Sequence, residues 1–132
     1  MLAFAILGAV SCVGCGGGTL DAEALSKQAE ALQSVAAEGA LLGQAAASGE
    51  TTQTFAREHS AALSELAAKT QESLRGATTQ PSLQPSLRRL TTLAADTTAA
   101  LEQLRDATQV EQRELAAMLR AAADQAERIA GS

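Results

Sequence analysis

The spacing of leucine and alanine after Leu20 restricts the fold more than any other feature of this sequence. These residues recur at steps of three and four, which places them on one side of an α-helix. The clearest stripe contains Leu83, Leu87, Leu90, Ala94, Thr97, Leu101 and Leu104. Residues that favour strands are scarce, since the chain has two phenylalanines and neither tryptophan nor tyrosine. The 132 residues therefore predict one all-α domain with a core of leucine and alanine.

Helix breakers and capping residues divide this pattern into four segments. We expect helices at about residues 20–48, 52–75, 83–106 and 109–130. Gly49 is placed to end the first segment as a C-terminal cap. Thr51 or Thr52 suits the N-cap of the second segment. Thr108 and Glu111 match a capping box at the start of the fourth, in which each side chain accepts a hydrogen bond from the other residue's backbone N–H.

Pro81 and Pro85 lie between the second and third segments. A proline is tolerated before a helix or in its first turn, so we expect one in each place, with Ser82 as the N-cap. Short connections make neighbouring helices antiparallel. The sequence thus predicts an antiparallel, up-down-up-down four-helix bundle over residues 20–132, behind an N-terminal signal segment. The alternative is a pair of loosely coupled helical hairpins that pack fully only on a partner.

Each of the other expected helices also presents an apolar stripe to the core. In the first, the stripe contains Leu25, Leu32, Val35, Gly39, Leu42 and Ala46. In the second, it contains Phe55, His59, Leu63, Leu66, Thr70 and Leu74. In the fourth, it contains Leu115, Met118, Ala122, Ala126 and Ile129. Gly39 and Gly43 form a G-x-x-x-G spacing with two open interpretations: a frayed or thinly packed turn, or a close helix crossing within the bundle or with a partner.

The N-terminal stretch differs from the rest of the chain, because Met1 to Val10 form an apolar run without a charge. This run is shorter than the roughly 20 residues of a transmembrane helix and has the length of the apolar region of a secretory signal. No lysine or arginine precedes it, so we expect the true start of the chain to lie upstream. The alternative is that the amino terminus alone supplies the positive charge of the signal. Cys12, Cys15 and the glycines Gly16–Gly18 follow directly.

This order of apolar run, small residues, cysteine and glycines resembles the signal peptide of a bacterial lipoprotein. In that family a signal peptidase cleaves before a cysteine, whose thiol receives a diacylglyceryl group. The resemblance implies that residues 1–14 are the signal peptide, that Cys15 is lipidated, and that residues 15–19 are a glycine-rich tether. Cys12 is the alternative lipidation site. The resemblance covers residues 1–18 and does not extend to the helical domain.

The C-x-x-C spacing of the two cysteines has other interpretations. A structural zinc site needs four ligands, and one such pair with one histidine does not supply them. A thioredoxin-like pair starts a helix after a strand, whereas this one ends an apolar run. A plain secretory signal with an incidental cysteine stays open as a third interpretation.

Charge and the remaining polar residues restrict the function further. The net charge of −5 without a basic stripe argues against nucleic-acid binding and against electrostatic docking on an anionic membrane. We interpret His59, the single histidine, as a helix residue at the core edge with its polar end in water. The alternative is a ligand to a bound molecule. We interpret Glu111 and Glu114, one turn apart, as a cap and a surface charge.

These observations predict a non-enzymatic, lipid-anchored helical protein on the outer face of a membrane in the bacterial cell envelope. We expect no catalytic residue, metal or cofactor. Its partners would be the membrane, through diacylglyceryl-cysteine, and a protein that it binds as a scaffold or partner-binding module. The alternative function is a helical-bundle binder of a small apolar ligand or haem that uses His59.

Overall fold

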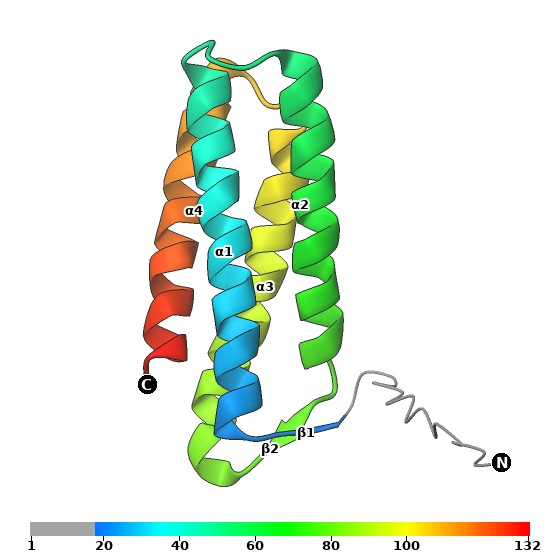
Figure 1. The fold of residues 1–132 in the computed structure, drawn as a ribbon, viewed down its shortest axis with the longest axis vertical. Coiled ribbons are helices and arrows are strands. Elements are labelled where there is room, and N and C mark those ends of the chain that lie inside the picture. The colour runs from blue at the N-terminus through cyan, green and yellow to red at the C-terminus, as the bar shows by residue number, and fades with distance from the viewer. Residues whose placement is uncertain (1–17) are drawn as a thin grey trace, which may run out of the picture.

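The computed structural model describes residues 18–132, and four helices running alternately up and down fill most of this range (Figure 1). They are α1 (Ala22–Ala47), α2 (Gln53–Leu74), α3 (Gln84–Leu104) and α4 (Gln109–Ala130). Each helix end lies within two residues of the expected position. A short strand, β1 (Thr19–Leu20), precedes α1. A second strand, β2 (Thr78–Thr79), follows α2, and a 3-10 turn, η1 (Pro81–Leu83), leads into α3. The predicted all-α, up-down-up-down four-helix bundle is confirmed.

Local capping explains most of these boundaries. Thr52 accepts a hydrogen bond from the backbone N–H of Phe55, at 3.1 Å, and Gly49 takes a φ of +72° after α1. Thr108 and Glu111 form the expected capping box at the start of α4. The start of α3 differs from the expectation, because Leu83 and not Ser82 occupies the N-cap position and no side chain caps the helix.

The prolines account for that difference. Pro81 opens the 3-10 turn and Pro85 lies in the first turn of α3, so one precedes the helix and the other is within it, as expected. The 3-10 turn leads directly into the helix, since the N–H of Gln84 bonds to the carbonyl of Pro81. The backbone therefore enters α3 already coiled, and Ser82 lies one residue too early to cap it.

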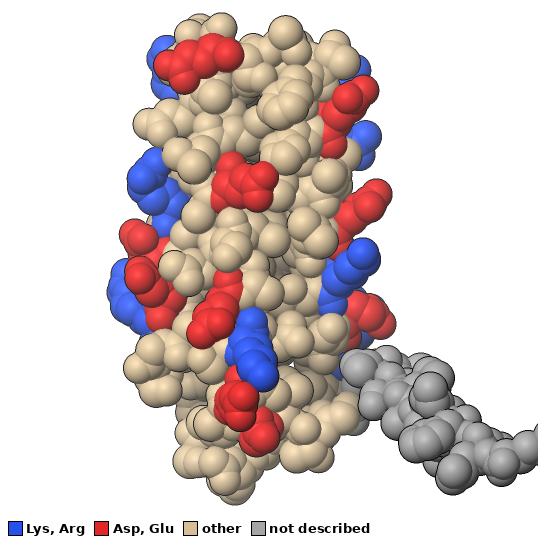
Figure 2. Space-filling view, viewed as in Figure 1, with Lys and Arg blue, Asp and Glu red and all other residues tan. Residues whose placement is uncertain are grey.

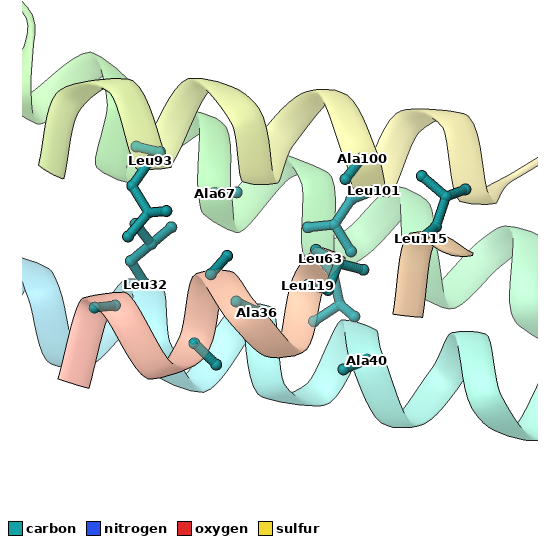
Figure 3. Close-up of a cluster of buried hydrophobic side chains, with 14 of the residues drawn as sticks. Leu32, Ala36, Ala40, Leu63, Ala67, Leu93, Ala100, Leu101, Leu115 and Leu119 are labelled. Carbon is teal, nitrogen blue, oxygen red and sulfur yellow. The ribbon is translucent and has the colours of Figure 1, made fainter. Parts of the chain in front are cut away.

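The bundle is built from two close helix pairs, α1 with α4 and α2 with α3, which stack as two layers. Leucines fill the space between the layers, where Leu93 and Leu101 of α3 point toward Leu32 of α1 and Leu119 of α4 (Figure 3). Within the α1–α4 layer the buried side chains are mostly alanine or glycine. Small side chains let two helix backbones approach closely. The larger leucine side chains lie mainly at the interface between the layers.

Gly39 and Gly43 lie in this close pair, so the close-crossing interpretation within the bundle is confirmed. A Cβ atom on Gly43 would lie 3.1 Å from the Cβ of Ala116 and 3.2 Å from the carbonyl oxygen of Gln112, both on α4. A Cβ atom on Gly39 would lie 2.6 Å from Leu101 Cδ2. Both glycines are buried inside α1, which continues regularly to Ala47, so the turn is not frayed.

The expected stripe is right for α3 but wrong in part for α2 and α4. Phe55 and Leu66 of α2 are 52% and 47% exposed, and Met118 of α4 is 57% exposed. Smaller neighbours replace the two α2 residues in the core, and Leu119 replaces Met118. The buried face of α2 instead contains Ala56, Ser60, Leu63, Ser64, Ala67, Thr70 and Leu74. On α2 small residues thus take the buried positions, whereas on α4 one large residue replaces another, and apolar spacing alone reveals neither.

Hydroxyl groups are buried between the helices, and their hydrogen bonds differ. Ser60 and Ser64 donate to the backbone carbonyls of Arg57 and Ala61, and Thr98 donates to that of Ala94 at 2.8 Å. The neighbouring Thr97 is 1% exposed, and its hydroxyl has no hydrogen-bond partner among residues 18–132. A buried hydroxyl without a partner costs about 1–3 kcal/mol.

We predict that Gly39→Ala lowers the free energy of unfolding by about 1–3 kcal/mol, measured by urea denaturation. The added methyl group would lie 2.6 Å from Leu101 Cδ2 and 3.2 Å from Leu119 Cδ1, so two fully buried leucines would have to repack. This loss opposes the gain of roughly 1 kcal/mol that alanine brings to a helix. In the Leu101→Ala background the same substitution is expected to be neutral or stabilising. A stabilised single variant would show that α1 is not tightly packed here.

We predict that Thr97→Val raises the free energy of unfolding by about 1–2 kcal/mol, because valine keeps the shape and removes the unpaired hydroxyl. Thr98→Val is the matched control on the adjacent residue, whose hydroxyl is hydrogen-bonded. It should bring no gain. Thermal unfolding of the two variants beside the wild type tests the difference, and equal effects of the two substitutions would contradict it.

Candidate functional site

The start of the described chain is attached to the connection between α2 and α3. β1 pairs in parallel with β2, with Thr19 opposite Thr78 and Leu20 opposite Thr79. The N–H of Thr78 donates to the carbonyl of Gly18 at 3.2 Å, and the hydroxyl of Thr79 donates to that of Leu20 at 2.6 Å. The sequence interpretation placed Thr19 in the tether and Leu20 in a helix, and it missed this pairing.

Further contacts gather several segments at the same end of the bundle. Gln84 Nε2 donates to the carbonyl of Thr79 at 3.1 Å, which ties β2 to the start of α3. Ser26 Oγ donates to the carbonyl of Ala130 at 2.8 Å, which ties the start of α1 to the end of α4. We call the part formed by β1, β2, η1 and the last turn of α4 the β1–β2 end (bottom of Figure 1).

The predicted lipidation residues, Cys15 and its alternative Cys12, lie outside the described residues. The described chain begins at Gly18, three positions after Cys15. What the structure adds is the place where the chain enters the domain, since Thr19 lies at the β1–β2 end. Four positions separate Cys15 from Thr19, which limits the distance between these two residues.

His59 lies at the edge between α1 and α2. Its Nε2 atom is 2.6 Å from Oε1 of Glu38 on α1, and its ring stacks on Phe55 with centroids 5.3 Å apart and planes 13° apart. The side chain of His59 is 34% exposed. One ring nitrogen is thus engaged by a carboxylate and one ring face is covered by Phe55, so this histidine joins two helices and does not point into the bundle interior.

The acidic residues considered from the sequence do not form a cluster with His59. Glu111 accepts a hydrogen bond from the N–H of Thr108 at 3.0 Å as part of the capping box, and Glu114 is exposed. Within residues 18–132, no three side chains of histidine, cysteine, aspartate or glutamate are placed to hold a metal ion. The geometry of Glu111 fits a structural cap.

Charge is distributed unevenly along the groove between α3 and α4. Near the α3–α4 connection the groove is lined by the acids Glu102, Asp106, Glu111 and Glu114. Near the β1–β2 end, two adjoining hollows that share Arg89 and Gln125 are lined by the arginines Arg88, Arg89 and Arg128 and the acids Asp96 and Asp124. On the α1–α2 face, by contrast, charges of both signs are interspersed with uncharged surface (Figure 2).

We predict that haem added to the purified chain produces no His59-dependent absorption band. The Nε2 atom of His59 already contacts the carboxylate of Glu38, and Phe55 covers one face of the ring. Wild type and His59→Ala should give the same spectrum as free haem. Glu38→Ala is a useful comparison, since it frees the Nε2 atom without removing the ring. A haem band that is present in the wild type and lost in His59→Ala would establish the ligand-binding alternative.

None of the helices within residues 18–132 has the length and apolar character needed to span a bilayer. The polar groups of the β1–β2 end hold backbone segments together, and the arginines beside it face solvent. No protein-family model matches the chain, and neither a curated protein nor a solved structure matches it.

Proposed function

We propose that this is a non-enzymatic, lipid-anchored protein of the bacterial cell envelope whose helical bundle works as a scaffold or partner-binding module. The lipid is a diacylglyceryl group on Cys15, with Cys12 as the alternative, and it holds the protein on the outer face of a membrane. The N-terminal apolar run, the cysteines and the glycines support the anchor. The single observation that carries the proposal is the attachment of Thr19 at one end of the bundle.

That attachment determines how far the domain extends from its anchor. Four residues lead from Cys15 to Thr19, and an extended chain spans at most about 3.6 Å per residue. Thr19 therefore lies within about 14 Å of a lipidated Cys15. From Cys12 the corresponding distance is about 25 Å.

A partner-binding role is supported by large apolar side chains on the outer faces of the bundle. Those with the highest exposure are Leu41, Phe55, Leu66, Val110 and Met118. Val110 is 63% exposed and Leu41 is 62% exposed. Isolated apolar side chains are common on protein surfaces, but five of this size are a large share in a chain so poor in big apolar residues. They are the natural contacts for a partner protein.

We predict that cells fed an alkyne fatty acid attach label to this protein, and that Cys15→Ala abolishes it while Cys12→Ala keeps it. The reason is that diacylglyceryl transfer requires the thiol of the residue just after the cleavage site. Labelled protein is detected after coupling to a fluorophore and electrophoresis. The double variant is the background control.

Other outcomes have defined meanings. Loss of label in Cys12→Ala alone would move the anchor to Cys12. Absence of label in the wild type would refute the lipid anchor and leave the plain secretory signal as the interpretation of the N-terminal stretch.

A further inference from the structure

Apolar side chains line the junction between α1 and α2, which the contact between Glu38 and His59 marks. Because these two side chains are 2.6 Å apart, the helical rows that contain them border each other. On α2, the apolar residues at steps of three and four in the row of His59 are Phe55, Ala62 and Leu66. On α1, the apolar residues that precede Glu38 at such steps are Ala31 and Val35. We call these five residues the α1–α2 strip.

The strip is open to a partner from outside. Four of its side chains belong to exposed residues, and Val35 is half-buried. The ring of Phe55 stacks on His59, which in turn contacts Glu38, so this ring is already ordered before a partner binds. Phe55 and Leu66 are eleven positions apart, which corresponds to about 16 Å along α2, or three turns of a helix.

Acidic residues border the strip on both helices. On α2, Glu58, Glu65 and Glu72 recur every seven residues, which is nearly two turns, so they form one row. On α1, Glu23, Glu30 and Glu38 recur at steps of seven and eight. All six belong to exposed residues. Acids lie along both helices of this face, with uncharged surface between them (Figure 2).

The bases of α1 and α2 do not balance these acids. The two helices together contain six acids and three bases, whereas α3 and α4 contain six acids and five bases. Of the three bases, Arg57 lies 3.1 Å from Asp106 and is thus paired with the α3–α4 connection. The other two are Lys27 and Lys69. The α1–α2 face is therefore net negative.

Half of the six acids have no ion pair. The paired acids are Glu23 with Lys27, Glu38 with His59 and Glu72 with Arg75. The others are Glu30, Glu58 and Glu65, and among residues 18–132 no basic nitrogen lies within 4.0 Å of their carboxylate oxygens. Lys69, four positions after Glu65, offsets only part of this charge.

The negative charge restricts what can cover the strip. In a symmetric dimer the same surface of both copies meets, so acidic rows would oppose acidic rows. An anionic membrane would be repelled for the same reason. A partner that surrounds an apolar face with basic side chains is complementary to the strip in both polarity and charge.

Resting on the partner-binding role proposed above, we propose that the α1–α2 strip binds a basic amphipathic helix of a partner protein. The apolar face of that helix covers Phe55 and Leu66, and its lysines or arginines lie against Glu58 and Glu65. Apolar residues spaced at three, four and seven positions over about three turns would match the strip in length. Attraction between the exposed charges makes this binding weaken as salt is added.

The test uses the full chain, kept reduced, and two fluorescein-labelled peptides of about 14 residues, or four helical turns. One has leucine and lysine in an amphipathic helical pattern, and the other has glutamate in place of each lysine. In fluorescence anisotropy we expect the lysine peptide to bind and the glutamate peptide not to bind. His59 is the single histidine, so its ring protons give isolated NMR signals beside the strip, and the lysine peptide should shift them.

Variants then locate the bound peptide. Phe55→Ser with Leu66→Ser should weaken binding of the lysine peptide by at least about tenfold. Val110→Ser with Met118→Ser removes equally exposed apolar side chains from α4 and should leave binding unchanged. Glu58→Gln with Glu65→Gln should weaken binding several-fold at low salt and reduce its salt dependence.

Glu102→Gln with Glu114→Gln is the matched charge control on α3 and α4, and it should have no effect. Equal binding of the two peptides, or equal effects of the two glutamate pairs, would overturn the charge complementarity. If binding is lost in the Val110 and Met118 variant and kept in the Phe55 and Leu66 variant, the partner-binding role survives and the α1–α2 strip does not.

Sedimentation of the chain alone tests a second copy as the occupant. We expect a monomer, and a dimer that Phe55→Ser with Leu66→Ser dissociates would overturn the proposal. The peptides report only on the bundle, so their failure together with fatty-acid labelling in cells would leave an anchored protein without this helix-binding face. Specific binding without labelling would instead refute the anchor and keep the helix-binding face.

Discussion

The close approach of α1 and α4 at Gly39 and Gly43 is the contact on which the rest of the bundle depends. A Cβ atom at Gly43 would lie 3.1 Å from the Cβ of Ala116 and 3.2 Å from the carbonyl oxygen of Gln112, so the two helices pack closely here. Glycine lowers the stability of an isolated helix, and the dispersion contacts that form along α1 and α4 when they pack closely offset this loss. That layer then presents leucines such as Leu32 and Leu119 to the second layer. A chain with almost no aromatic residues reaches a packed interior in this way.

In the layer formed by α2 and α3, serine and threonine join alanine as small buried residues. Ser60 and Ser64 are buried on α2, and each hydroxyl donates to a carbonyl of its own helix. Serine thereby acts as a small side chain and adds little polar cost. Thr97 is the exception among the described residues, since its hydroxyl is buried without such a bond. Burial of small side chains leaves Phe55 and Leu66 at the surface, where Phe55 stacks on His59.

Much of the fold was predictable from the sequence, because caps and breakers act locally. The four helices and their ends followed from Gly49, Thr52 and the capping box of α4. The sequence did not predict which side of α2 and α4 faces the core. Apolar spacing favours large residues such as Phe55 and Leu66, whereas the packed α2 buries the small residues beside them. The stripe of α3 was right because its inward positions are the large ones, including Leu90 and Leu101.

At the candidate site, too, local features were predictable from the sequence and contacts between distant segments were not. Cys15 and its alternative Cys12 were predicted as lipidation sites from their local sequence context, and both lie outside the described residues. The pairing of β1 with β2 joins residues 59 positions apart, and no local pattern predicts it. The two threonines between Gly76 and Pro81 were the only available sign of extended backbone there. His59 was placed near the core edge, but its contact with Glu38 on another helix required the packing of α1 against α2.

The parallel pair of β1 and β2 also has a mechanical consequence. A force applied to the chain before Thr19 does not act on α1 alone, because β1 passes part of it to β2 and so to both α2 and α3. The bond between Ser26 and the end of α4 brings the fourth helix into the same junction. All four helices therefore share a load that enters through a single strand, and α1 is protected from being peeled out of the bundle from its first turn.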